Sequence, residues 1–251
     1  MQATLARRDA TLAKFLDGPR TKPALVECLD KSRSTVDRAV TELCDVDCLE
    51  PVEVAGSEFR ITTTGELALQ SYREYCAESA ALAENAKLLN TLPDGEELSK
   101  TFFFEADVYS SSRTPDVAIQ PGADLLEDAT KMVGTAPVAK REYFDSIIHW
   151  LESGDSRLEL VLEAELVTSI DQTYQAKFEE LKDFDRVTVY EIDEQLPYAL
   201  WVMDRDEGDY AGITIYEDGG VKGALVTDSK PAVEWARDQY DRYRRRSIRL
   251  G

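Results

Sequence analysis

The sequence predicts an α+β protein with three parts: a small helical N-terminal domain, a long connecting helix and a larger mixed α/β domain. Residues 32–43 form an amphipathic helical pattern, and a β-hairpin pattern follows it. Helical periodicity then continues unbroken over residues 65–90, and beyond residue 100 strand patterns alternate with helical ones. The predicted boundaries are 1–65, 66–92 and 100–251, and 251 residues suffice for a core in each of the two domains.

Two short helices precede the helix at 32–43. The first is predicted at 4–16, with Leu5, Leu12, Phe15 and Leu16 facing inward, and Gly18-Pro19 ends it. Thr21 is placed to cap the second helix, whose first turn tolerates Pro23 and whose apolar face holds Leu25, Val26 and Leu29. Asp30-Lys31 then forms a short turn, so this region has the pattern of a helix-turn-helix.

The helix at 32–43 has one face built for burial and one built for contact. Ser32 is placed to cap it, and Val36, Ala39, Val40 and Leu43 lie on one side at helical spacing. The opposite side is small and polar, with Arg38 at its centre. Such a face suits base edges in a DNA major groove, although an ordinary amphipathic surface helix has the same pattern.

A β-hairpin pattern follows, with strands at 49–54 and 59–62 around the turn Ala55-Gly56-Ser57-Glu58. The run from "SRSTVDRAVTEL" through "FRITTTGELAL" resembles archaeal and bacterial winged helix-turn-helix transcription regulators, over about 75 residues. In this interpretation Arg38 and Ser34 read bases, and Arg33 and Arg60 contact phosphates. The predicted DNA-binding residues are Arg33, Ser34, Thr35, Asp37, Arg38, Thr41 and Arg60.

The long helix carries a weak heptad pattern. Ala68, Tyr72, Tyr75, Ser79, Leu82, Ala86 and Leu89 recur at alternating spacings of four and three. The pattern favours a homodimer held by Tyr72, Tyr75, Leu82 and Leu89, and a connector packed on its own domain is the alternative. Thr91-Leu92-Pro93-Asp94-Gly95 breaks the helix and marks the domain boundary.

The second domain is predicted to hold strands at 103–109, 116–119, 135–139, 157–163, 186–192, 198–204, 210–216 and 221–226. Helices are expected at 122–133, 141–153, 164–182 and 230–247.

This domain resembles the effector domain of archaeal methanogenesis and filament-growth regulators and their haloarchaeal relatives. The resemblance lies in the segments "FDSIIHWLESGDSRLELVLEAELVTSI", "DRVTVYEIDEQLPYALWVMDRD" and "GGVKGALVTDSKPAVEWARDQYDRYR". That domain is similar to the phospholipase-D-like, sensor half of TrmB-type regulators. The resemblance implies a non-catalytic effector-sensing domain and leaves the effector unnamed.

The net charge of −20 is unevenly distributed. Residues 1–65 hold 9 Lys and Arg against 11 Asp and Glu, so most of the acidity lies outside the predicted DNA-binding part. This pattern is typical of proteins from organisms with molar salt in the cytoplasm, where the Debye length is only about 3 Å. No apolar run reaches the roughly 20 residues of a membrane span, and the N-terminus lacks a signal-peptide pattern, so we expect a cytoplasmic protein.

Catalytic signatures are weak. Phospholipase-D chemistry needs two histidines, and the chain has only His149, which we expect to be a packed or surface residue. No nucleotide-binding glycine pattern occurs, so we expect no enzyme activity, no cofactor and no metal. Cys28, Cys44 and Cys48 suggest a thiol switch, half of a metal site or small buried residues that support the helix-turn-helix, and we favour the last. Candidate effector-pocket residues are Ser111, Arg113, Tyr190, Trp201 and Tyr216.

The C-terminal helix ends in an arginine cluster, which we define as Arg237, Arg242, Arg244, Arg245, Arg246 and Arg249. We expect it to dock on acidic surface of its own domain or of a dimer partner, with DNA as the less favoured target.

The favoured function is a DNA-binding transcription regulator, a homodimer on double-stranded DNA that senses a small molecule or a partner. The alternatives are a regulator whose second domain serves only dimerisation or protein contacts, a thiol-based redox regulator and a phospholipase-D-type enzyme.

Overall fold

The computed structural model describes residues 1–52, 57–93, 98–111 and 116–250. The chain divides into two compact units, Met1–Glu84 and Asn85–Gly251. The boundary between them falls inside helix α4 (Thr63–Leu89). None of the described helices is both long and apolar enough to cross a membrane.

The first unit contains α1 (Gln2–Leu12), a 3-10 turn (Ala13–Phe15), α2 (Lys22–Leu29) and α3 (Arg33–Cys44). Strands β2 (Leu49–Pro51) and β3 (Glu58–Ile61) pair antiparallel and form the wing. The tip of the wing lies outside the described residues. A strand that the sequence did not predict, β1 (Arg20–Thr21), pairs with the other edge of β3. The three helices and the antiparallel hairpin that the sequence predicted for this unit are therefore present.

Helix α4 begins where the wing ends, and a glycine lets it approach the core closely. The Thr62 hydroxyl accepts a hydrogen bond from the Gly65 amide at 2.9 Å and donates one to the Asp47 carbonyl. A Cβ atom on Gly65 would lie 2.2 Å from the Cys48 carbonyl oxygen, so no other residue fits there without a backbone shift. Leu69 is buried, and Ala68 and Tyr72 pack against the core of the same unit.

The second unit is built on an eight-stranded mixed sheet. Its strands are β4 (Asp107–Ser110), β5 (Ala129–Ala136), β6 (Arg157–Glu163), β7 (Val187–Ile192), β8 (Ala199–Arg205), β9 (Tyr210–Glu217), β10 (Gly220–Thr227) and β11 (Ile248–Arg249). The order across the sheet is β11-β7-β6-β5-β8-β9-β10-β4. Strands β5, β6 and β7 are parallel and the other pairings are antiparallel, as predicted for a mixed sheet. The parallel β6–α8–β7 crossover and the β8–β9–β10 meander are both present.

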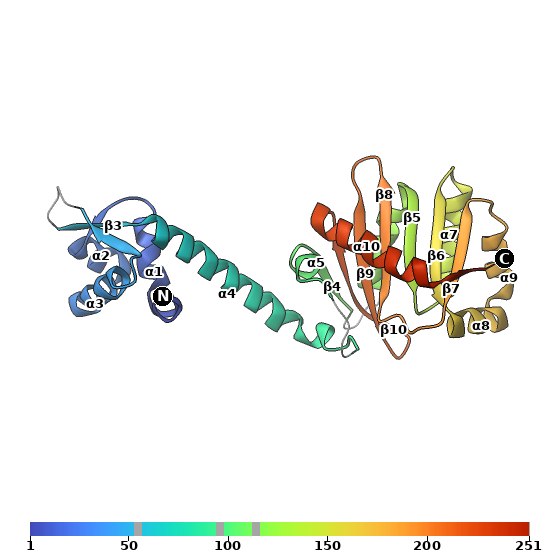
Figure 1. Cartoon of the computed structure of the whole chain (residues 1–251), viewed down its shortest axis with the longest axis horizontal. Helices are drawn as coiled ribbons and strands as arrows, with labels where there is room; N and C mark the ends of the chain where they lie inside the picture. The colour runs from blue at the N-terminus through green and yellow to red at the C-terminus, as the bar shows by residue number, and fades with distance from the viewer. Residues whose placement is uncertain (53–56, 94–97, 112–115, 251) are drawn as a thin grey trace. The chain divides into compact units, whose positions relative to one another are not determined.

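Helices cover both faces of this sheet, giving three layers. Helix α10 (Lys230–Arg246) crosses one face and contacts α5 (Lys100–Phe104), as Figure 1 shows for the red helix. The helices α6 (Asp116–Glu127), α7 (Arg141–Glu152), α8 (Ala164–Thr173) and α9 (Gln175–Lys182) lie on the other face. A cluster of buried apolar side chains packs between the sheet and α6–α9.

Several predicted elements of this unit were wrong. The strand at 103–109 is a short helix capped by Ser99, which buries Phe102 and Phe103, followed by β4. The segment predicted as a strand at 116–119 is the start of α6. This helix continues through Pro121, although proline is usually tolerated only in the first turn of a helix. As a result, β5 begins at Ala129, inside the predicted helix, and ends before most of the predicted strand at 135–139. The predicted helix at 164–182 is broken at Tyr174 into α8 and α9.

Candidate nucleic-acid interface and ligand pocket

Helix α3 presents the polar face that the sequence predicted. The Ser32 hydroxyl accepts a hydrogen bond from the Thr35 amide at 3.3 Å, which caps the helix. Val36, Ala39, Val40 and Leu43 are 0–1% exposed, so the apolar face is fully used in the core of the unit. The exposed residues of α3 include Arg33, Ser34, Asp37, Arg38 and Thr41.

The charges around α3 are partly neutralised by neighbouring elements. Asp37 forms an ion pair with Lys22 at 3.0 Å. Glu42 binds Arg8 at 3.0 Å, and the side-chain hydrogen bond from Arg8 is the main cause of the lowered pKa of the Glu42 carboxyl. These pairs link α3 to α2 and α1 and offset the two carboxylates that would otherwise repel phosphate.

The arginines of the interface differ in how far they are already engaged. Arg33 and Arg38 make no ion pair with any described residue. Arg60 on β3 is bound to Glu50 on β2 at 2.7 Å, so its charge is already paired within the wing. Thr35 bonds the capping Ser32 hydroxyl, and the Thr41 hydroxyl donates to the Asp37 carbonyl. Arg38 therefore lies at the centre of a small polar face without an ion-pair partner among the described residues.

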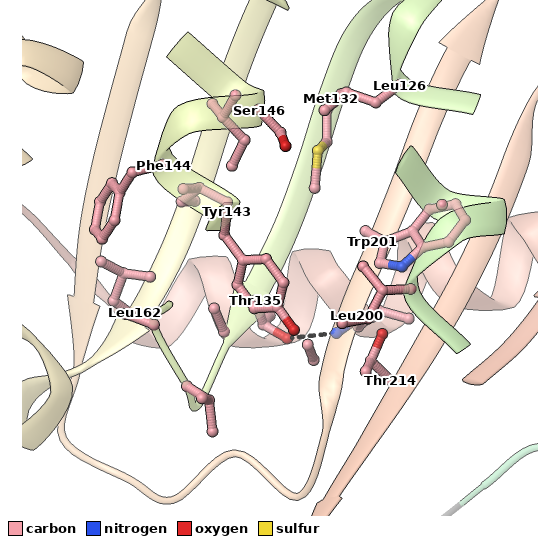
Figure 2. Close-up of a pocket in the computed structure, with 18 of the residues that line it drawn as sticks. Leu126, Met132, Thr135, Tyr143, Phe144, Ser146, Leu162, Leu200, Trp201 and Thr214 are labelled. Carbon is pink, nitrogen blue, oxygen red and sulfur yellow. Dashed lines mark hydrogen bonds between the residues drawn. The ribbon is translucent and has the colours of Figure 1, made fainter. Parts of the chain in front are cut away.

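The second unit contains a cavity of about 180 Å³ between the sheet and the layer formed by α6–α9. Trp201 from β8 and Tyr216 from β9 line it, as predicted. Figure 2 shows Trp201 on one side of the cavity and Tyr143 reaching in from α7 on the other, towards Thr135 of β5. The Thr135 hydroxyl accepts a hydrogen bond from the Leu200 amide at 3.1 Å, which holds it against the sheet (Figure 2).

Glycines on β9 and α6 make room for the Trp201 ring. Gly134 and Gly212 are its register partners on β5 and β9. A Cβ atom on Gly212 would lie 2.0 Å from the indole ring, and one on Gly122 of α6 would lie 3.3 Å away. The indole therefore lies flat over Gly212 and next to α6, and forms a wall of the cavity.

Two tyrosine hydroxyls meet at the cavity. Tyr143 from α7 and Tyr216 from β9 form a hydroxyl–hydroxyl hydrogen bond of 3.3 Å. Burial raises the pKa of both phenols, so both remain protonated at neutral pH. The sequence singled out Tyr216 and missed Tyr143, because nothing in an amphipathic helix marks which residue will reach a partner on the sheet.

The other predicted pocket residues are not part of the cavity. Tyr190 lies on the opposite face of the sheet, where the Arg244 guanidinium of α10 stacks 3.4 Å from the centre of its ring. Ser111 follows β4 at the sheet edge, where its amide donates to the Lys222 carbonyl, and it does not line the cavity. Arg113 lies outside the described residues. The sequence does not reveal which face of the sheet a strand residue such as Tyr190 occupies. Ser111 lies just beyond the end of β4, at the sheet edge and away from the cavity.

The cysteines are unsuited to a reactive thiol pair. Cys48 is fully buried, and burial raises the pKa of both the Cys44 and the Cys48 thiols. Since the thiolate is the reactive form, a raised pKa disfavours redox chemistry at these two residues. Cys28 is exposed, and its thiol donates to the Leu25 carbonyl. Among the described residues no group of three potential metal ligands is found.

Part of the arginine cluster docks on its own domain. Arg237 binds Asp204 and Asp209, Arg244 stacks on Tyr190, and Arg246 pairs with Glu194 at 2.8 Å. Arg245, by contrast, is exposed and bonds only a carbonyl of its own helix among the described contacts. The acidic surface that these arginines use is intramolecular, as one of the predicted alternatives proposed.

Both units of the chain match known family models. Residues 115–246 match the family model described as the methanogenesis regulatory protein FilR1, middle domain, and residues 1–83 match the HVO_A0261 N-terminal domain. The chain belongs to the FilR1 middle-domain family of regulatory proteins.

Solved structures show a distant likeness. TrmBL2, described as an archaeal chromatin protein with a novel mode of DNA binding, is 12% identical, with a TM-score of 0.44, over 98% of this chain and 93% of its own. NucT from Helicobacter pylori is 10% identical over 58% of this chain and 98% of its own, with a TM-score of 0.46. The phospholipase D family member Nuc from Salmonella typhimurium is 8% identical over 58% and 97%, with a TM-score of 0.43. Comparison with the curated proteins finds no match.

Proposed function

We propose that this protein is a sequence-specific DNA-binding transcription regulator that acts as a homodimer and whose second unit binds a small-molecule effector. The main support for DNA binding is the exposed face of α3, where Arg38 lies between Ser34 and Thr41. Arg38 makes no ion pair with any described residue. A helix of this kind presents small polar groups and one bidentate donor to base edges.

Effector binding is favoured over a purely structural second domain because the sheet and its helices leave a cavity of about 180 Å³. Protein interiors pack tightly and seldom leave voids larger than a water molecule, so a domain that served only as a dimerisation module would not need such a space. The proposal includes no catalytic step. The one histidine of the chain, His149, is exposed on α7 and does not line the cavity.

Dimerisation is proposed through the exposed part of α4. Tyr75 and Leu82 lie on the heptad positions and are 56% and 45% exposed. Tyr72, which the sequence also assigned to the seam, packs on the core of its own unit, and Leu89 is only partly exposed. The proposed seam therefore centres on Tyr75 and Leu82.

Selection of duplexes from a random library by the full-length protein, in molar salt, tests the proposal. A regulator of this kind enriches one motif, arranged as an inverted repeat if it binds as a dimer. The bound duplex is then titrated by fluorescence anisotropy against a scrambled duplex. Equal affinity for both would contradict sequence-specific binding. A single unrepeated motif would contradict the dimer while leaving specific binding intact.

A further inference from the structure

The cavity in the second unit has an unusual lining, because every described residue that lines it is uncharged. The side chains are aliphatic or aromatic, and the only polar groups they contribute are hydroxyls and the Trp201 indole N–H. No Lys, Arg, His, Asp or Glu is among the described lining residues, in a chain where 31% of residues are charged.

An ionic ligand would find no partner in such a cavity. A carboxylate, phosphate or ammonium group that enters must give up its hydration, and only an opposite charge or several hydrogen bonds offset that cost. The excess of Asp and Glu in the rest of the chain adds long-range repulsion for anions. A polyol must give up the hydration of every one of its hydroxyls, whereas the Tyr143, Tyr216 and Thr135 hydroxyls of the lining already make hydrogen bonds within the protein.

The size of the cavity suits a small ligand. Its volume of about 180 Å³ is close to the roughly 150 Å³ at which an apolar protein cavity accommodates benzene. One ring with a small substituent therefore fits. The Trp201 indole lies close against the Gly212 backbone, and its planar ring suits a planar face of a ligand.

One end of the cavity can recognise a polar atom. The Tyr143 and Tyr216 hydroxyls lie 3.3 Å apart, and Thr214 of β9 lines the same space. Only one of the two phenols can donate to the other, so the second hydroxyl hydrogen is left to point elsewhere. It is available to an acceptor on a ligand, and burial keeps both phenols protonated by raising the pKa of each.

We propose that the effector is an uncharged, predominantly apolar molecule of about one ring, with a single hydrogen-bonding oxygen that the Tyr143–Tyr216 pair recognises. This inference rests on the effector-binding part of the proposed function and specifies its chemistry. It separates this cavity from sites for sugars, nucleotides, phosphorylated metabolites and metal ions, all of which need charged or densely polar linings.

Four probes of similar size test the inference by calorimetry on the full-length protein without DNA. Acetophenone is neutral with one carbonyl, benzoate is its anionic counterpart, benzylammonium is cationic and glucose is a neutral polyol. We expect acetophenone to bind and the other three to bind at least about tenfold more weakly. Absence of acetophenone binding, or benzoate or glucose binding as tightly, would overturn the inference.

Paired variants localise the binding. Ala123→Phe, on α6 in the cavity lining, should abolish acetophenone binding by filling the space, whereas Ala176→Phe, on the exposed face of α9, should not. Tyr216→Phe should weaken acetophenone about three- to tenfold and leave toluene, which has no oxygen, unaffected. Tyr190→Phe removes the corresponding hydroxyl on the opposite face of the sheet and should change neither. Unaltered binding in Ala123→Phe would place the probe elsewhere and contradict the inference.

Separate experiments test the ligand chemistry of the cavity and the proposed regulation of DNA binding, so one of the two proposals can be contradicted without the other. Calorimetry without DNA reports only on the cavity. Anisotropy with the selected duplex, with and without saturating acetophenone, reports on coupling between the two units. Binding of acetophenone with unchanged DNA affinity would support the cavity inference and count against effector sensing.

Discussion

Trp201 and Gly212 face each other across β8 and β9, and a Cβ atom on Gly212 would lie 2.0 Å from the indole ring. Glycine is otherwise unfavourable inside a strand, so its presence at this position indicates a required close approach. We expect Gly212→Val to lower the free energy of unfolding by about 1–3 kcal/mol, because the indole or the strand must shift.

Guanidinium unfolding measures this effect, and Gly154 provides the control. A Cβ atom on Gly154 would meet nothing closer than the Ser156 hydroxyl at 3.8 Å. Gly154→Ala should therefore leave the unfolding midpoint nearly unchanged. A Gly212→Val variant as stable as the parent protein would show that the indole moves freely, and the cavity wall would not be rigid.

The DNA contact of α3 is predicted to depend on Arg38 more than on Arg60. Arg38→Ala should weaken binding to the selected duplex by about 1–3 kcal/mol and relax the preference at one base position. Arg33→Ala should weaken all sequences alike, as loss of a phosphate contact does. Arg60→Ala should have the smallest effect of the three, because Glu50 already neutralises Arg60. Anisotropy on selected and scrambled duplexes separates these outcomes, and an isotherm unchanged by Arg38→Ala would remove α3 as the reading helix.

Substitutions at two positions of the heptad pattern, Leu82 and Tyr72, should have different effects on the predicted dimer. Leu82 is 45% exposed, so Leu82→Glu should convert a dimer to a folded monomer. Tyr72→Glu should instead destabilise the first unit, since Tyr72 packs on its core. Sedimentation velocity in molar salt, combined with circular dichroism, distinguishes dissociation from unfolding. A parent protein that sediments as a monomer at micromolar concentration would contradict the seam.

Two adjacent arginines of the C-terminal cluster should differ in their effect on stability. The Arg244 guanidinium lies 3.4 Å from the centre of the Tyr190 ring, whereas Arg245 is exposed. Arg244→Ala should lower the free energy of unfolding by about 0.5–2 kcal/mol through loss of the cation–π contact. Arg245→Ala should stay within about 0.5 kcal/mol of the parent protein. If both variants kept full stability but bound DNA more weakly, the cluster would be a phosphate-binding surface instead.

A pH effect is expected at Glu163, at the end of β6. Burial raises the pKa of its carboxyl, although its Oε1 accepts a 2.6 Å hydrogen bond from the Leu196 amide. A raised pKa in the folded state means that this group favours folding when protonated, and that this contribution is lost as the pH rises through the folded pKa. Glu163→Gln keeps an acceptor and removes the buried charge. The variant should therefore gain stability over the parent at neutral pH, and the difference should vanish in acid. A difference that did not vary with pH would contradict this account.

The winged helix-turn-helix was predictable in detail because its signals are local. The Ser32 cap, the spacing of Val36, Val40 and Leu43, and the hairpin pattern each depend on residues close in sequence. The second unit was less predictable where long-range packing overrode local preference. Pro121 lies inside α6, and Ser99 caps a helix in a segment rich in Phe that resembled a strand. Of the five residues proposed for a pocket, Trp201 and Tyr216 line the cavity, Tyr190 and Ser111 do not, and Arg113 lies outside the described residues.

The sequence by itself determined the order of the two domains, the polar face of α3 and the uneven distribution of acidic charge. A further local signal lies in Gly134 and Gly212, which interrupt strands that are otherwise rich in apolar and β-branched residues. Only the tertiary structure decided that these glycines flank Trp201 and that Tyr143 meets Tyr216. It also placed Tyr190 under Arg244 rather than in the cavity. The physical reason is that side chains alternate between the two faces of a strand, whereas strand order and helix placement are set by contacts between residues far apart in the chain.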